Sequence, residues 1–426
     1  MRPCKRMCVL LLSAFVLLYL AACTGTPDSK EESGTGSIPT TQTENATTVT
    51  DETIVSTGTE EMTTNTMTNT PSTSVITTSR PSTTAAPTTT TVPEKKAVMR
   101  VLFIGDSNTE NGYITAGLRD KIKVAYGDCG SGYDTINPYS GYNNRQCSTT
   151  VEHDAGWYEF DMQRGGAGSS DPGPYYSPDG NALTSSVKGA RTTITFIGNG
   201  VDVYYPTAPQ RGQITVALDD GVPQTVEQNG EVALHRLRLD AGAYGHHSVT
   251  IVNNGASPVE LSGIDIFGGE TSNALRSVVD VWGNAAASSK DYAKTERKTT
   301  VDAVKWLMPT HVVILLGTND YNAVQTFPDK FEANILEIIS RVREGAPNAK
   351  ITVASTCNIQ YDENNPFKLN YLAESFPNIR DKAGVHYFDL NSWFGAYDSS
   401  KYMDWGHVNK EWGRKIGEQF YLEIQK

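Results

Sequence analysis

Long apolar runs recur along the chain from residue 98 to its end, and each is followed by the spacing of an amphipathic helix. The runs are "VMRVLFI", "HVVILL", "KITVAS" and "VHYFDL". Strands without polar alternation are buried on both faces, as in a parallel sheet covered by helices. The pattern therefore predicts an α/β fold with helices on both faces of a parallel sheet. Ligands of such sheets bind at the carboxyl ends of the strands.

The alternation of strands and helices stops between residues 191 and 267, where apolar and polar residues alternate in period two. "VDVYYP" and "ITVALDDG" show this pattern, and turn formers such as "GNG" and "NNG" separate the segments. These features predict an antiparallel β-sandwich. Because strand–helix units resume after it, we place the sandwich at 161–269 as an insertion into an α/β domain made of 96–160 and 270–426.

The first 23 residues have the features of a bacterial targeting signal, with a basic start and a short apolar stretch. The stretch is too short for a comfortable membrane span. It ends in "LAAC", which resembles a lipobox, so Cys23 is the expected lipid-modified N-terminus. An ordinary secretory signal is the alternative. The expected location is outside the cytoplasmic membrane, as a lipoprotein.

Residues 24–95 are rich in Thr, Ser and Pro and poor in apolar side chains. Such a segment buries too little surface to offset the entropy lost on ordering, so we expect a disordered tether. Outside the signal the cysteines are Cys129, Cys147 and Cys357. An oxidising location permits a disulfide, and the nearness of the first two favours their pairing, although the sequence does not settle it.

Three polar clusters follow or flank the predicted elements of the α/β parts: "GDSN" at 105–108, "GTND" at 317–320 and "DWGH" at 404–407. Each alone has an ordinary explanation, as a turn, a helix cap or a structural histidine. Together they predict nucleophilic acyl transfer. Ser107 needs a base, His407 can serve as that base, and Asp404 is close enough to orient its ring. Asn319 is placed to stabilise an oxyanion.

"FIGDSN", "LLGTND" and "DWGH" resemble the first, third and fifth sequence blocks of the SGNH (GDSL-type) hydrolases, over about 97–160 and 270–426. The resemblance implies a three-layer, flavodoxin-like parallel sheet. It also implies that Ser107 is the nucleophile and one oxyanion donor, Asn319 the oxyanion amide, His407 the base and Asp404 its orienting carboxylate. No cofactor is expected.

The second block of this family supplies a further backbone N–H to the oxyanion hole, and its match here is the weakest. "VVDVWGNAAAS" is the best candidate, which assigns the donor to Gly283. Related enzymes often have a second glycine where this chain has Ala285 and Ala286. "RGGAGSS" at 164–170 is a rival that no predicted strand precedes. Asn108 replaces a common leucine, and its side chain could face a sugar hydroxyl or solvent.

"LRDKIKVAYGDCGSGY" is similar to the region after the nucleophile in bacterial SGNH esterases that remove O-acetyl groups from peptidoglycan. Some of those enzymes carry an inserted carbohydrate-binding jelly roll, and related enzymes deacetylate xylan or mannan. The resemblance therefore implies a serine esterase acting on an acetylated glycan. Alternatives are a glycan O-acetyltransferase, a lipase or thioesterase on the same fold, and a non-catalytic glycan-binding lipoprotein.

The net charge and the distribution of the histidines argue against nucleic acid and metal ions as ligands. The formal net charge is −12, which disfavours nucleic acid as a partner because phosphate binding needs a cationic surface. The 7 histidines are scattered, so no metal site is expected. Membrane contact is expected through the lipid anchor only.

Overall fold

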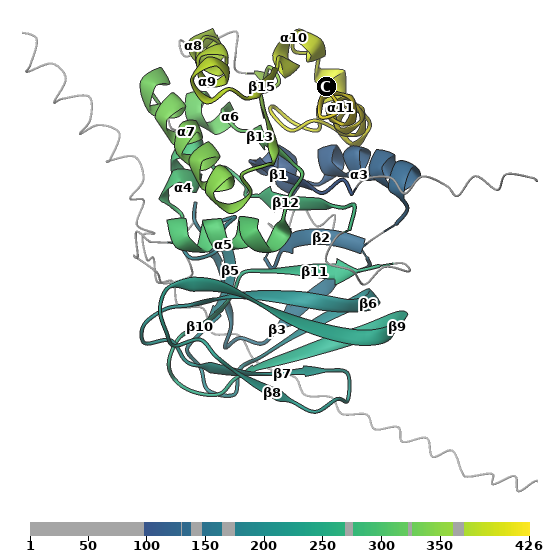
Figure 1. The fold of residues 1–426 in the computed structure, drawn as a ribbon, viewed down its shortest axis with the longest axis vertical. Coiled ribbons are helices and arrows are strands. Elements are labelled where there is room, and N and C mark those ends of the chain that lie inside the picture. The colour runs from purple at the N-terminus through teal and green to yellow at the C-terminus, as the bar shows by residue number, and fades with distance from the viewer. Residues whose placement is uncertain are drawn as a thin grey trace, which may run out of the picture. The chain divides into compact units, whose positions relative to one another are not determined.

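Five parallel strands form the central sheet of the computed structural model (Figure 1). Numbered along the chain within this sheet, their spatial order is 2-1-3-4-5, the flavodoxin-like order, which confirms the predicted α/β fold. The winding reverses between the first and third strands, so the loops after these two strands open into one crevice. In spatial order the strands are β12 (Val279–Gly283), β1 (Val101–Gly105), β13 (His311–Leu315), β14 (Lys350–Ala354) and β15 (His386–Phe388).

The structure describes residues 98–128, 130–137, 147–163, 175–268, 276–322, 326–360 and 370–426, all within the compact unit Thr89–Lys426. The predicted signal at 1–23, with Cys23, and the predicted tether at 24–95 lie outside the described residues. In the described part of the chain, none of the helices combines the length and the apolar character needed to cross a membrane.

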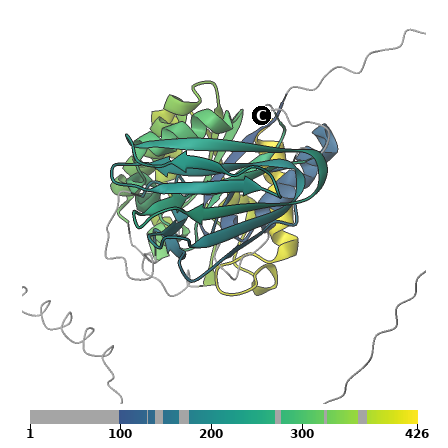
Figure 2. The ribbon, with the colours of Figure 1, turned by 90° about the horizontal axis from the view of Figure 1, so that it is seen from below.

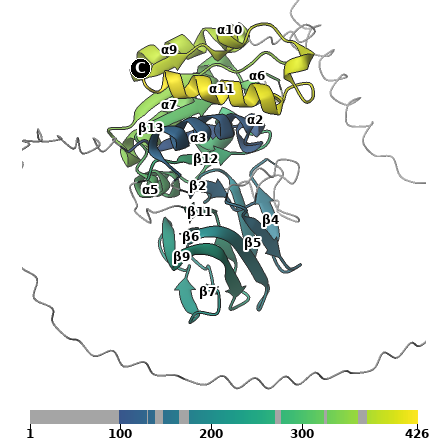
Figure 3. The same cartoon turned by 90° about the vertical axis from the view of Figure 1, so that its right-hand side faces the viewer.

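Helices cover both faces of the sheet. One layer contains α3 (Tyr113–Tyr126), α10 (Leu390–Phe394) and α11 (Lys410–Glu423), and Figure 3 shows α3 and α11 side by side. The other layer contains α4 (Ser289–Lys294), α5 (Arg297–Leu307), α7 (Pro328–Gly345), α8 (Asn370–Ala373) and α9 (Ser375–Ala383). Short helices lie in the loops: α2 (Ser107–Glu110), α6 (Thr318–Asn322) and η2 (Ser399–Lys401).

The side chains of β1 show why its sequence lacks polar alternation. Val101 and Phe103 pack into the core beneath α3 and α11. Leu102 and Ile104 pack into the core on the opposite face. Both faces of the strand are therefore buried, as the apolar run predicts.

Two antiparallel sheets pack against each other and form the predicted sandwich, whose larger sheet faces the viewer in Figure 2. The larger sheet has the order β2 (Gly130–Thr135), β11 (Gly263–Phe267), β6 (Arg191–Thr207), β9 (Ala233–Asn253), β7 (Gln213–Leu218) and β8 (Gln224–Glu227), and β3 (Thr150–His153) pairs with β6. The smaller sheet has the order β10 (Val259–Leu261), β5 (Asn181–Ser185) and β4 (Tyr158–Asp161).

The antiparallel region begins earlier than the sequence predicted. β2, β3 and β4 belong to the antiparallel sheets, although they lie within the 96–160 segment that we assigned to the α/β domain. β2 contains two glycines, β3 does not alternate, and the alternation of β4 spans only 4 residues, so none of these short strands stands out in the sequence. The insertion therefore starts directly after α3 and ends before β12.

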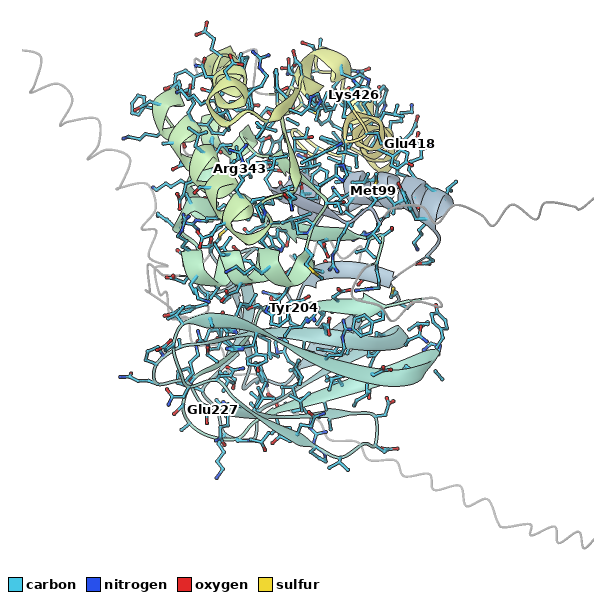
Figure 4. All side chains as sticks on the ribbon, viewed as in Figure 1. Met99, Tyr204, Glu227, Arg343, Glu418 and Lys426 are labelled. Carbon is cyan, nitrogen blue, oxygen red and sulfur yellow. The ribbon has the colours of Figure 1, made fainter. Side chains whose placement is uncertain are left out.

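A buried ionic cluster joins the sandwich to the edge of the parallel sheet. Arg100 donates two hydrogen bonds of 2.7 Å to the carboxylate of Asp280 and a third, of 3.1 Å, to Asp265 of β11. Arg276 donates to the same Asp265 oxygen at 2.5 Å. Tyr204 of β6, labelled in Figure 4, is fully buried in the adjoining core. Because the charges are paired and hydrogen-bonded, their burial is tolerated, and loss of one partner would leave the other uncompensated.

The favoured pairing of Cys129 with Cys147 is not found. Cys147 is a free thiol whose side chain packs against the sandwich core, and Cys357 is also free. Cys129 lies outside the described residues. Burial raises the pKa of Cys147 to about 11, so this thiol is neutral at physiological pH.

Candidate active site

Ser107 lies at a sharp turn between β1 and α2. A Cβ at Gly105 would collide with the side chain of Thr109, so the strand must end in glycine here. Asp106 caps the helix, because its Oδ1 accepts the backbone N–H of Asn108 at 3.0 Å. Ser107 is the first helical residue, where backbone N–H groups have no partner within the helix. The turn thus presents both a hydroxyl and a backbone donor at the carboxyl edge of the sheet.

His407 connects Ser107 to a carboxylate. Its Nε2 lies 2.8 Å from Ser107 Oγ, and its Nδ1 lies 2.7 Å from Asp404 Oδ2. The loop between η2 and α11 fixes this geometry locally, since Asp404 Oδ1 accepts the backbone N–H of Gly406 at 2.9 Å and of His407 at 2.8 Å. The structure therefore brings together, in one hydrogen-bonded row, three residues that the sequence analysis proposed to act together.

The surroundings of Asp404 keep its carboxylate charged at neutral pH. Partial burial raises the pKa of Asp404, but hydrogen bonds from the Gly406 and His407 backbones and from the His407 ring outweigh it, so the pKa lies below its usual range. Asp404 can therefore orient the imidazole and stabilise the imidazolium at neutral pH. In contrast, burial raises the pKa of Asp106 to about 6.

Asn108 holds the loop that carries His407. Its Nδ2 donates to the carbonyl of Gly406 at 3.2 Å, and its Oδ1 accepts the N–H of Val408 at 3.0 Å. These are the residues on either side of His407. The sequence suggested that this side chain faces a sugar hydroxyl or solvent, and the structure instead directs it to the protein backbone. The sequence marked Asn108 in one way: it is polar where the family commonly has leucine.

Asn319 reaches the same crevice from the next strand. It lies in α6, which follows β13, and β13 pairs with β1 so that Leu315 lies opposite Gly105. Its Nδ2 donates to the carbonyl of Ala287 at 2.9 Å. A primary amide carries a second N–H, which makes a further donor available to a ligand.

Gly283 does not have the geometry expected of an oxyanion donor. Asn284 N donates to Gly105 O at 3.2 Å, so the backbone of Asn284 faces β1. Neighbouring residues of a strand direct their backbone groups to opposite sides, so the N–H and C=O of Gly283 face away from β1 and Ser107. Its carbonyl accepts from Asn181 of β5 at 3.2 Å. The assignment of Gly283 is therefore corrected.

The loop after β12 has an unusual backbone conformation at Ala286. Ala286 is exposed and has a φ of 63°, a left-handed conformation that favours glycine. The turn is closed by the N–H of Ala287, which donates to Asn284 O at 3.1 Å. The sequence hinted at this conformation only by having Ala286 where related enzymes often have glycine. The rival segment at 164–170 lies outside the described residues.

Among the residues that the structure describes, no three His, Cys, Asp or Glu side chains are grouped as ligands of a metal ion.

Part of the chain matches a known protein family, and its fold resembles that of solved structures. Residues 263–411 match the GDSL-like lipase/acylhydrolase family. A peptidoglycan O-acetylesterase structure has a TM-score of 0.60 at 17% identity, over 77% of this chain and 91% of that chain. Family two carbohydrate esterases from Cellvibrio japonicus and Clostridium thermocellum, the latter in complex with cellohexaose, match 65% of this chain and 98% of theirs. Their identities are 12% and 16% and their TM-scores 0.27 and 0.28. No curated protein matches the chain.

Proposed function

We propose that this chain, an SGNH-type carboxylic ester hydrolase, removes O-acetyl groups from a polysaccharide through an acyl-enzyme on Ser107. The observation that carries the proposal is the row from Ser107 Oγ through His407 to Asp404, with separations of 2.8 Å and 2.7 Å. The row supplies a nucleophile, a base and an orienting carboxylate at the carboxyl edge of the sheet.

In the first half of the reaction, His407 Nε2 takes the proton of the Ser107 hydroxyl while Oγ attacks the acetyl carbonyl carbon. The carbonyl π electrons move to oxygen, and a tetrahedral oxyanion forms. When the intermediate collapses, the bond to the sugar oxygen breaks, and that oxygen takes the proton from His407. Asp404 stays ionised throughout and stabilises the imidazolium.

In the second half, water attacks the acetyl group on Ser107 with His407 again as the base. The bond to Ser107 Oγ breaks, that oxygen takes the proton from His407, and acetic acid leaves and loses its own proton to water. Both halves pass through an oxyanion at the same position, so the same donors serve each.

The donors that we assign are the Ser107 N–H, the second N–H of the Asn319 amide and the Ala286 N–H. The last replaces Gly283. Ala286→Gly should retain kcat within about threefold, because glycine adopts a positive φ freely, whereas the β-branched Ala286→Val should lower kcat by a larger factor. Equal activity of the two variants would remove Ala286 from the oxyanion hole.

The proposed substrate is an acetylated glycan: peptidoglycan, xylan or mannan. Two observations support this class. The chain shares its fold with a peptidoglycan O-acetylesterase, and a sandwich is inserted next to the site. The test is acetate release from the three acetylated polymers, with Ser107→Ala as the control. We expect release from at least one polymer by the wild type and a loss of about 10⁴-fold or more in the variant.

Other results of this test would select other functions. Transfer of the acetyl group to a hydroxyl of an added acceptor sugar indicates a transferase, and turnover of long-chain esters or thioesters alone indicates a lipase or thioesterase. Glycan binding with no turnover indicates a binding protein. Full activity of Ser107→Ala would contradict the proposed mechanism.

We further propose that the enzyme works outside the cytoplasmic membrane, anchored through a lipid on Cys23. The "LAAC" sequence supports this proposal, and 24–95 would then be the tether. The wild type should incorporate a labelled fatty acid and sediment with membranes, whereas Cys23→Ser should do neither. Labelling of the variant to the wild-type level would contradict the anchor.

A further inference from the structure

A buried amide cluster connects the inserted sandwich to the loop that follows β12. Asn181, the first residue of β5, donates from Nδ2 to Gly283 O at 3.2 Å. Asn284 Nδ2 donates to Asn181 Oδ1 at 3.0 Å and to Asp179 O at 3.2 Å. All three side chains have exposed fractions of 1% or less, so water does not supply alternative partners.

The sandwich side of this cluster is itself fixed. Asp179 Oδ1 accepts from Ser177 Oγ at 2.7 Å and from the backbone N–H of Asn181 at 3.1 Å. These contacts set the backbone just before β5. The Asn181 amide is therefore held in one orientation, with its donor toward Gly283 and its acceptor toward Asn284.

The other side of the cluster leads to the proposed oxyanion donors. Asn284 N donates to Gly105 O at 3.2 Å, two residues before Ser107. Asn284 O accepts the Ala287 N–H and so closes the turn that contains Ala286. Ala287 O in turn accepts from Asn319 Nδ2 at 2.9 Å. A displacement of this loop would therefore move both the Ala286 N–H and the Asn319 amide.

We propose that Asn181 is a positioning residue for the oxyanion hole, so that the inserted sandwich is a structural part of the catalytic site. This inference rests on the proposed function. Oxyanion donors act only when they are preorganised at hydrogen-bond distance from the developing charge, and small displacements reduce the rate strongly. Loss of the Asn181 amide leaves the Gly283 carbonyl without that buried donor and Asn284 without one acceptor, and the loop relaxes to satisfy them.

The test compares Asn181→Ala with a matched variant, Asn253→Ala. Asn253 is also fully buried in the sandwich, but its Nδ2 donates to the Ser185 carbonyl at 3.1 Å, at the other end of β5 from Asn181. We expect comparable decreases in Tm for the two variants. Asn181→Ala should lower kcat about 10- to 100-fold with KM within about threefold, while Asn253→Ala should keep kcat within about threefold.

A second variant distinguishes the effect of losing the Asn181 hydrogen-bond donor from the effect of losing side-chain volume. Asn181→Leu keeps approximately the volume of the side chain but has no N–H to donate to Gly283 O, so its kcat should fall as in Asn181→Ala. It also covers the case in which the alanine variant does not fold. Wild-type kcat in a folded Asn181→Leu or Asn181→Ala protein would overturn the inference and leave the proposed function intact. An inactive wild type would overturn both.

Discussion

The two sides of Ser107 are built in different ways. On the base side, Asp404, Gly406 and His407 lie within one short loop, and their hydrogen bonds join neighbours in sequence. On the oxyanion side, the Asn319 amide reaches a carbonyl 32 positions away, and Asn181 reaches one 102 positions away. The base is thus oriented by contacts within its own loop, which Asn108 joins to the turn of Ser107, whereas the oxyanion side depends on packing among several distant segments. Variants should therefore affect the two sides differently.

The largest expected effect is on the base side. His407→Ala removes the ring that is hydrogen-bonded to Ser107 Oγ. We therefore expect kcat/KM to fall by about 10⁴ or more, which corresponds to a loss of about 5 kcal/mol or more in transition-state stabilisation. The measurement is acetate release at saturating and limiting substrate. Because the loop is held by Asp404 and Asn108, the Tm should change little. A loss of less than tenfold would exclude His407 as the base.

The next effect concerns the segment that supports the oxyanion side. Burial raises the pKa of Asp179 from 3.8 to about 7, so the folded protein binds a proton below about pH 7 that the unfolded chain binds only below about pH 4. The stability that this group contributes is therefore present below pH 4 and is lost as the pH rises through about 7.

Asp179→Asn has no such titration and keeps an oxygen for Ser177 and for the Asn181 N–H. Relative to the wild type, its free energy of unfolding should rise between pH 4 and pH 8 by an amount on the order of 4 kcal/mol. Denaturant titrations across that range measure the difference, and the exposed Asp220→Asn is the control. A difference that does not vary with pH would contradict the prediction.

Asn319→Ala tests the oxyanion side directly. Loss of one preorganised donor should lower kcat about 10²- to 10³-fold, with a smaller change in KM. Asn334→Ala is the matched control, since Asn334 lies on α7 and its amide donates to Ser289 Oγ of α4 at 3.0 Å. A kcat loss below threefold in Asn319→Ala, or an equal loss in both variants, would remove Asn319 from this role.

The smallest effect is expected from Asn108→Leu, which removes both hydrogen bonds beside His407 while Asp404 still holds the loop. We expect kcat to fall about 10- to 100-fold and KM to change little. Asn108→Asp retains an acceptor for the Val408 N–H but loses the donor to Gly406 O, so its activity should lie between those of the wild type and Asn108→Leu. A leucine variant as active as the wild type would show that local contacts of Asp404 alone fix the base.

The sequence predicted best those parts of the molecule whose structure depends on residues that are close together along the chain. Apolar runs such as β1 and β13 are buried on both faces, and this leaves a direct pattern in the sequence. Asp404 and His407 are close enough along the chain that their contact needs no knowledge of the fold. The parallel sheet, the sandwich and the Asp404–His407 pair were accessible for this reason. The grouping of Ser107 with His407, which are 300 positions apart, was accessible because their motifs resemble those of a known family.

The parts that could not be predicted depend on register and on distant contacts. Gly283 and Asn284 are adjacent, yet one faces away from β1 and the other toward it, and a sequence does not specify which. The partner of Asn181 is set by how the sandwich packs on β12, and no local pattern marks it. The short strands β2, β3 and β4 derive their structure from pairing with other strands, since segments of 4 to 6 residues are too short to leave a clear pattern in the sequence.

The pairing of β2 with β11 has a consequence for how the chain reaches its fold. β1 and β12 are adjacent, and the hydrogen bond from Met99 N to Ser277 Oγ beside them spans 178 positions. β2 and β11 lie at the two ends of the insertion and pair antiparallel, so their association brings the segments on either side together. Closing a loop costs more entropy as it lengthens, and non-local pairing slows folding. If the sandwich forms first, β1 and β12 are joined through a short effective connection. In pulse-labelled hydrogen exchange, amides of the β6–β9 pair should therefore gain protection before those of β1.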